Sequence, residues 1–233
     1  MRKIHYLFLM TLFASLYSCA GVAPADRAKS GPDTPSFIEV NKEVDISFEE
    51  QQKLAFEKFN EILEVSQEGD RLDQLGKMAG LYIEIINEYP DAHLAQESCM
   101  RLISLYLIDY NPPKEKEAIE LDIYHRSRYP DSPLRNAIED TVMRYFYKKG
   151  EWKELQEYVT PHIKDFIKTG ELRTPVHLFY YSEAKFNLND YKEAYKGYKI
   201  IIKRFPKSRD TSVAVKRIGT IKMAVEMEKR NGK

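Results

Sequence analysis

The chain has 233 residues, of which 43% are hydrophobic, with 36 Lys and Arg residues against 36 Asp and Glu residues. This length suits one large or two small domains, and the lack of a basic excess argues against a protein that holds nucleic acid by its phosphates. The two cysteines exclude a disulfide scaffold, and the five histidines are few for a metal enzyme.

The N-terminal segment has the layout of a secretory signal peptide. Arg2 and Lys3 form a short basic start, and residues 4–16 are almost entirely apolar. This run is too short to cross a bilayer as a stable helix. We therefore expect residues 1–18 to be removed, which leaves a slightly acidic mature chain because two cations leave with the signal.

The end of the apolar run resembles the lipobox of bacterial lipoproteins, because Leu16 lies three residues before Cys19 and the small Ser18 lies directly before it. The resemblance implies cleavage before Cys19 and lipidation of that residue on its sulfur and its new amino group. In many Gram-negative bacteria, a residue such as Ala20 at the next position implies retention in the outer membrane. An ordinary signal peptide with an incidental cysteine is the alternative.

Residues 19–46 are expected to form a flexible tether after the lipidated cysteine. This stretch contains Pro24, Gly31, Pro32 and Pro35 and has no sustained hydrophobic periodicity. A coil of this length typically spans about 30 Å. A lipid-anchored domain would therefore hang near the membrane without lying on it.

The rest of the chain, residues 47–233, contains an internal repeat. The pairs Tyr89-Pro90, Tyr129-Pro130 and Phe205-Pro206 each close an amphipathic run, and their spacing is about 40 residues and then about twice that. The missing member of the series is expected at the break Lys168-Thr169-Gly170. Proline stops each helix, and a short turn follows.

Short polar breaks divide each repeat into two helices, with no alternating strand pattern between them. The breaks are Glu68-Gly69-Asp70, Asn111-Pro112-Pro113, Lys149-Gly150-Glu151 and Leu188-Asn189-Asp190. A single helical hairpin cannot bury its apolar face alone, and stacked hairpins form a continuous core. The sequence therefore predicts an all-α protein built from helix pairs.

Residues 175–208 resemble a tetratricopeptide repeat (TPR), with the turn and second-helix start at Asn189–Ala194, an aromatic at Tyr198 and a closing Pro206. Residues 136–169 repeat this form, and residues 99–132 and 48–92 follow it less closely. The resemblance implies a right-handed superhelical solenoid of about four TPR-like helical hairpins, with residues 210–228 as a C-terminal capping helix.

Catalytic and metal-binding motifs are not found in the sequence: there is no phosphate loop, zinc pattern or nucleophile elbow. Cys99 falls in a helical pattern and is interpreted as a buried core residue. The histidines that follow the tether are interpreted as surface or cap residues rather than ligands; they are His93, His125, His162 and His177. We expect no catalytic residue, metal, cofactor or small-molecule substrate.

The TPR resemblance implies a concave groove, lined by the first helix of each pair, that binds a segment of another protein. Carried over residue by residue, the groove comprises Met100, Ile103, Leu107, Tyr110, Asp140, Arg144, Tyr147, Lys148, Phe179, Glu183 and Phe186. Leu107, Arg144 and Glu183 stand where the carboxylate-clamp pattern needs Asn, which argues against a C-terminal carboxylate as the ligand. For the apolar members, plain inter-helix packing is the alternative.

The whole layout resembles TPR lipoproteins of the bacterial envelope, among them the helical lipoprotein of the outer-membrane β-barrel assembly machinery. The resemblance implies a non-enzymatic scaffold with a protein partner in the envelope, anchored through lipid on Cys19 to the periplasmic face of the outer membrane. Two alternatives stay open: a peptidoglycan-binding or peptidoglycan-processing protein, and a pilotin-like accessory of a secretin or pilus.

Overall fold

The computed structural model describes residue 38 and residues 44–67, 71–172 and 174–231, and within these residues it is entirely helical, which confirms the all-α prediction. The helices are α2 (Phe48–Val65), α3 (Arg71–Glu88), α4 (His93–Ser104), the π-helix η1 (Leu105–Asp109), α5 (Glu115–Arg128), α6 (Arg135–Lys149), α7 (Trp152–Thr169), α8 (Val176–Asn187), α9 (Tyr191–Arg204) and α10 (Arg209–Asn231).

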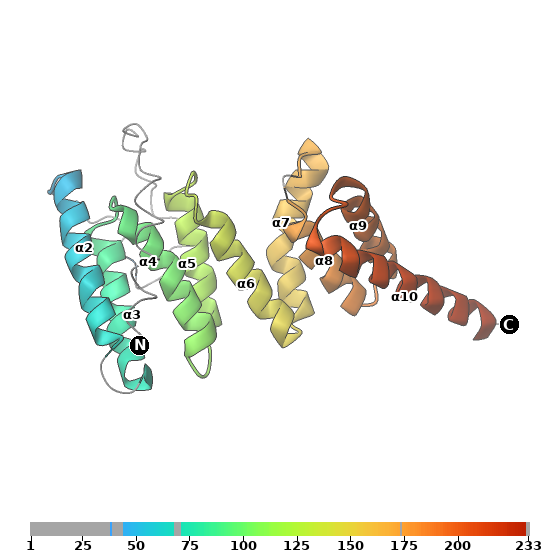
Figure 1. Ribbon diagram of the computed structural model, residues 1–233, viewed down its shortest axis with the longest axis horizontal. Coiled ribbons are helices and arrows are strands. Elements are labelled where there is room, and N and C mark those ends of the chain that lie inside the picture. The colour runs from blue at the N-terminus through green and yellow to red at the C-terminus, as the bar shows by residue number, and fades with distance from the viewer. Residues whose placement is uncertain (1–37, 39–43, 68–70, 173, 232–233) are drawn as a thin grey trace, which may run out of the picture.

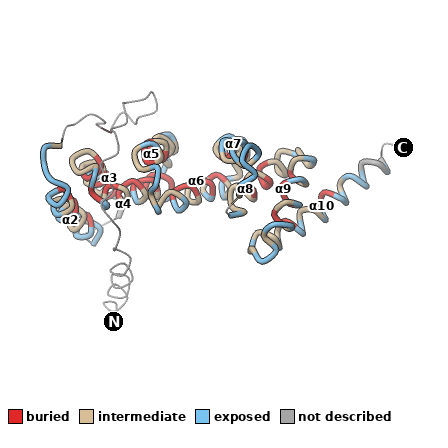
Figure 2. The backbone as a smooth tube through the Cα atoms, turned by 90° about the horizontal axis from the view of Figure 1, so that it is seen from above, coloured by how far each residue is buried: buried red, intermediate tan, exposed pale blue. Residues whose placement is uncertain are grey.

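The helices form an elongated array in which each packs on its neighbours along the chain (Figure 1). Alternate helices also contact one another, because α2 touches α4, α4 touches α6, α6 touches α8, and α8 touches α10. Buried residues follow the middle of the array from end to end (Figure 2). One row of helices is therefore continuous through the molecule, and α3, α5, α7 and α9 pack beside it.

Local signals place the helix ends. Gly150 and Gly170 follow the last residues of α6 and α7 with φ of 74° and 72°, a left-handed conformation that glycine adopts without steric cost. The break expected at Lys168-Thr169-Gly170 is therefore the end of α7. At the start of α9, the side chain of Asp190 accepts a hydrogen bond from the backbone N–H of Glu193.

The first two aromatic-proline turns interlock. The Tyr129 hydroxyl donates to the carbonyl oxygen of Pro90 at 2.7 Å, so the turn after α5 is bonded to the turn after α3. Asp91 is held from two sides, by the Gln51 side chain on α2 and by the Arg128 guanidinium at the end of α5. These bonds fix the position of each turn relative to its neighbours.

The apolar core consists of two clusters that meet at α7 and α8, both of which contribute residues to each. Ala118 on α5 and Ala194 on α9 are fully buried. Cys99 is a free, buried thiol whose pKa is raised because burial disfavours the thiolate, as the core interpretation predicts. Ile38, within the expected tether, is buried against the first cluster.

The signal peptide, Cys19 and most of the expected tether lie outside the described residues. Within the described part of the chain, no helix has the length and apolar character needed to cross a membrane.

Gly197 provides a test of the packing between α8 and α9. A Cβ atom at this position would lie 2.0 Å from Ser182 Oγ and 3.3 Å from Ser182 Cβ. We expect Gly197→Ala to lower the free energy of unfolding by about 1–3 kcal/mol, because the helices must move apart. Urea unfolding of the purified protein measures the change.

The control for this prediction is Gly80→Ala on α3, where nothing lies within 4 Å of the added Cβ. That variant should stabilise the protein by up to about 1 kcal/mol, because alanine favours a helix over glycine. In a Ser182→Ala background, the penalty of Gly197→Ala should shrink because Oγ is gone. An equal penalty in both backgrounds would contradict the proposed contact.

Candidate functional site

A cleft of about 430 Å³ opens between α6, α7 and α8, beside the turn that precedes α6. Its lining is largely polar and charged and comprises Pro130, Asp131, Ser132, Arg135, Asn136, Glu139, His162, Asp165, Phe166, Glu171, Leu172, Thr174 and His177.

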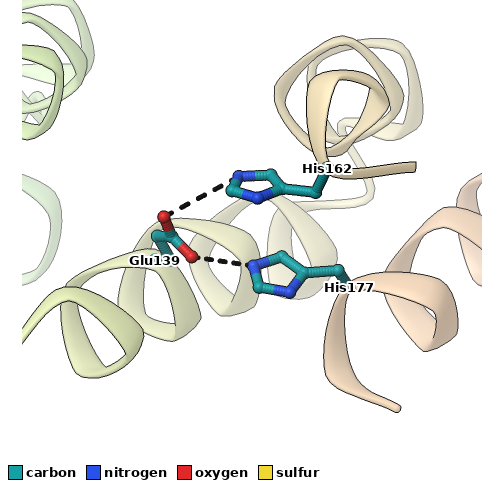
Figure 3. A group of neighbouring side chains, drawn as sticks. All are labelled: Glu139, His162 and His177. Atoms are coloured by element: carbon teal, nitrogen blue, oxygen red, sulfur yellow. Dashed lines mark hydrogen bonds and ion pairs between the residues drawn. The ribbon is translucent and has the colours of Figure 1, made fainter. Parts of the chain in front are cut away.

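Three ionisable side chains from three different helices meet in this cleft (Figure 3). Glu139 lies one turn into α6, His162 lies in α7, and His177 lies in the first turn of α8. His177 Nε2 is 2.8 Å from Glu139 Oε2, and His162 Nε2 is 3.8 Å from Glu139 Oε1. The two imidazole rings are stacked, with centroids 4.1 Å apart and planes 17° from parallel. We refer to these three residues as the His-Glu cluster.

Glu139 is ionised in this setting although its side chain is only 2% exposed. Burial raises the pKa of a carboxyl group, but hydrogen bonds from His177 and Arg135 more than offset that effect and bring the pKa of Glu139 to about 2. An ionised carboxylate only accepts hydrogen bonds. The Nε2 atom of His177 therefore carries the hydrogen in the Glu139 contact.

His162 differs from His177 because its Nε2 atom is buried and has no hydrogen-bond partner within the described chain. Burial, followed by the neighbouring His177, lowers the pKa of His162 to about 4. The ring is therefore neutral near pH 7, with a ring nitrogen turned toward Glu139 (Figure 3). A neutral imidazole nitrogen in this position is available as a ligand.

A second buried polar group lies next to the cluster. Asp122 on α5 is fully buried and accepts a hydrogen bond from the Tyr158 hydroxyl at 2.8 Å, and Arg126 pairs with it at 3.0 Å. His125, on the same helix, is also fully buried, and neither of its ring nitrogens has a hydrogen-bond partner within the described chain. Its pKa is lowered to about 4, first by burial and then by the charge of Arg135.

The structure divides the expected groove residues into three groups. Arg144 and Lys148 are exposed; Ile103, Leu107 and Glu183 are buried; the others are half-buried. Members from α6 and α8 come together, because the Tyr147 ring packs on Phe179 and its hydroxyl reaches Glu183. The buried members, Ile103 and Leu107 among them, face the core and present no surface to a partner.

Glu183 is the centre of a buried network rather than an exposed groove residue. Its carboxylate accepts two hydrogen bonds from Arg217 on α10, at 2.9 and 2.7 Å. Tyr198 on α9 donates to it at 2.6 Å, and Tyr147 on α6 donates at 3.2 Å. This side chain therefore joins four helices, which is a structural role.

The interpretation of the histidines as surface or cap residues is wrong for His125, which is fully buried. His162 and His177 are half-buried, and both have a ring nitrogen directed at Glu139. No local motif indicates the His-Glu cluster, because its members come from separate helices. The available signal is the repeat length: Glu139 and His177 are 38 residues apart, about one helix pair.

No protein-family model matches the chain, and a search of the curated proteins finds no match.

The burial of His125 predicts a loss of stability in mild acid. The unfolded histidine binds a proton near pH 6.5 and the folded one only near pH 4, so the unfolded state holds more protons between these values. The stability that the neutral, buried His125 contributes is therefore fully present above pH 6.5. As the pH falls from 6.5 toward 4, the free energy of unfolding decreases by up to about 1.4 kcal/mol per pH unit. Urea unfolding across this range measures it.

His125→Phe should reduce this pH dependence, because the remaining ring does not titrate. Leu121→Val, which removes a buried methylene group from the same helix, is the matched control and should lower stability equally at every pH. An unchanged slope in the His125→Phe variant would contradict the assignment to His125.

Proposed function

We propose that the chain is a lipid-anchored interaction scaffold of the bacterial envelope, involved in outer-membrane protein assembly or a similar process. In this proposal α2 to α9 form about four TPR-like hairpins of a right-handed solenoid, with α10 as the cap. Lipid on Cys19 holds the domain at the periplasmic face of the outer membrane. A segment of a partner protein binds along the row formed by α4, α6 and α8.

The spacing of the long-range side-chain bonds supports the repeat architecture. Tyr129 to Pro90 spans 39 residues, Tyr158 to Asp122 spans 36, and Arg217 to Glu183 spans 34. Each bond joins a helix pair to the preceding one at about the length of one TPR unit. Stacked repeats produce this pattern because each unit contacts mainly its neighbours.

The observation that carries the binding proposal is the surface of α6 and α8 next to their mutual contact. Exposed Arg144 and Lys148 flank a half-buried aromatic group in which the Tyr147 ring lies 6.3 Å from Phe179 and 5.5 Å from Trp152. Aromatic residues and arginine are the side chains most often found at the energetic centres of protein interfaces. We therefore place the partner segment over Arg144, Tyr147, Lys148 and Phe179.

The glycan-binding alternative depends on freely exposed aromatic rings. Tyr110, Tyr147, Phe179 and Phe186 are half-buried, and Phe186 lies beneath the Arg217 guanidinium at 4.3 Å. The contact with Arg217 makes Phe186 less available for stacking on a sugar, and the scaffold is the function that we propose.

A photo-crosslinking amino acid at Lys148 tests the proposal in membranes. We expect a defined crosslinked partner protein whose yield falls at least about tenfold in an Arg144→Glu variant, because the charge reversal repels a partner matched to these cations. Mass spectrometry of the crosslinked species identifies the partner. The absence of any crosslink in cells that retain the folded protein would refute the proposed surface.

Lys153 on α7 provides the matched control, because it is also an exposed lysine but lies on the neighbouring row of helices. The crosslinker at Lys153 should not capture the same partner, and Lys153→Glu should leave the crosslink from Lys148 intact. Equal effects at Lys148 and Lys153 would indicate non-specific charge attraction.

A further inference from the structure

The His-Glu cluster has the composition of a metal site. The ligand atoms of Glu139, His162 and His177 lie within 4.8 Å of one another, and all three residues line the same cleft. Imidazole nitrogens and a carboxylate oxygen are the donors that zinc and related divalent ions accept. Calcium and magnesium prefer sites built from oxygen alone, so the donor set favours a transition-metal ion such as Zn²⁺.

The unpartnered Nε2 of His162 and the carboxylate of Glu139 suit such an ion. His177 becomes a ligand when its Nε2 loses the hydrogen that it donates to Glu139, either to solvent or by a tautomer shift to Nδ1, because metal binding to histidine requires a deprotonated nitrogen. His162 offers a buried Nε2 with no hydrogen-bond partner within the described chain, and it is 3.8 Å from Glu139 Oε1, too far for a hydrogen bond. The ionised Glu139 offsets part of the charge of a divalent cation. Buried nitrogens without a hydrogen-bond partner are rare in folded proteins. A cation between His162 and Glu139 would give His162 Nε2 a partner.

The three ligand atoms lie within 4.8 Å of one another, so the set must contract to hold one ion. Ligand atoms around a tetrahedral zinc ion lie about 3.3 Å apart, given zinc–nitrogen bonds of about 2.0–2.1 Å. Glu139 and His177 are already closer than this at 2.8 Å, and His162 must approach Glu139 by a fraction of an ångström. Rotation of the two rings out of their stacked arrangement would direct both Nε2 atoms at one point.

Arg135 is a positioning residue in this arrangement. Its Nε donates to Glu139 Oε1 at 2.9 Å from one turn earlier on α6 and fixes the orientation of the carboxylate. Groups that hold a metal-ligating carboxylate in this way raise metal affinity because the ligand is already oriented before the ion arrives. The guanidinium charge opposes a bound cation, but Arg135 bonds Oε1, and Oε2 faces His177 and can ligate the ion once the His177 Nε2 hydrogen has left.

We propose that Glu139, His162 and His177 bind one divalent transition-metal ion, with zinc as the preferred ion, and so tie α6, α7 and α8 together. Three protein ligands leave one tetrahedral position open, and the cleft that the same residues line gives solvent or a ligand group access to it. The ion would bridge the helix pair α6–α7 and the following helix α8. It would stabilise the folded chain because the unfolded chain lacks the assembled site.

Zinc titration of the purified full-length protein, stripped with a chelator and kept in detergent, tests the proposal. We expect one zinc ion per chain, measured by equilibrium dialysis with metal analysis, and a dissociation constant in the micromolar range or below. Zinc should also raise the thermal unfolding midpoint, and chelator should reverse the rise. A protein that binds no zinc under these conditions would overturn the proposal.

Two variants separate the site from adventitious binding. His162→Ala removes a ligand whose Nε2 bonds to nothing within the described chain, and His177→Gln keeps a hydrogen-bond donor for Glu139 while it removes an imidazole. Each should weaken zinc binding at least about 100-fold and abolish the zinc-dependent rise in the unfolding midpoint. Their far-UV circular dichroism without metal should match that of the parent protein.

His93→Ala is the matched control, because His93 is an exposed histidine on α4, outside the cleft. This variant should bind zinc as tightly as the parent protein does. If His162→Ala and His177→Gln also bind zinc with unchanged affinity, the ion is held elsewhere on the chain and the proposed site is wrong. This outcome does not bear on partner binding, which is measured separately by crosslinking.

Discussion

The fold depends on ion pairs and hydrogen bonds that join a buried carboxylate to the next helix pair along the chain. Asp122 is bonded from Tyr158, Glu139 from His177, and Glu183 from Arg217. Asp122 and Glu139 also pair with an arginine on their own helix, whereas the arginine that pairs with Glu183 comes from α10. A buried carboxylate is costly to leave unbonded, so the stacking arrangement that supplies these donors is favoured. Burial of apolar side chains drives adjacent helix pairs together. The hydrogen bonds of the buried carboxylates favour one placement of each pair against the next.

The polar bonds of buried carboxylates constrain α8 more than the other helices. This helix contributes to both apolar clusters, carries His177 near its first residue, and carries Glu183 near its last turn. Its first end is thus bonded to α6, and its second end is bonded to α9 and α10 and, through Tyr147, to α6 again. Gly197 lets α9 lie close against its middle. A change in the position of α8 therefore disturbs polar contacts in both directions along the array.

The sequence predicts the helices well because their ends depend on local chemistry: Gly150 and Gly170 adopt left-handed conformations, and Asp190 caps α9. Which residue faces the core is harder to predict. After α4 the chain continues as the π-helix η1, in which Tyr110 N–H bonds to the Leu105 carbonyl five residues earlier. A π-turn shifts the helical phase, and an α-helical period carried through Leu107 then assigns a buried residue to the groove.

The candidate metal site could not be predicted from a motif because no two of its ligands share a helix. Glu139 and His177 are 38 residues apart and meet because α6 contacts α8, a contact that the sequence alone does not specify. Two different faces of α6 then carry the two proposed sites, the metal site and the partner surface. Glu139 points into the cleft, and the next residues outward, Asp140 and Arg144, form an exposed ion pair on the surface proposed for the partner. Because α6 and α8 also carry that surface, any change in their separation on metal binding would alter partner affinity, and by linkage the partner would alter metal affinity by the same factor.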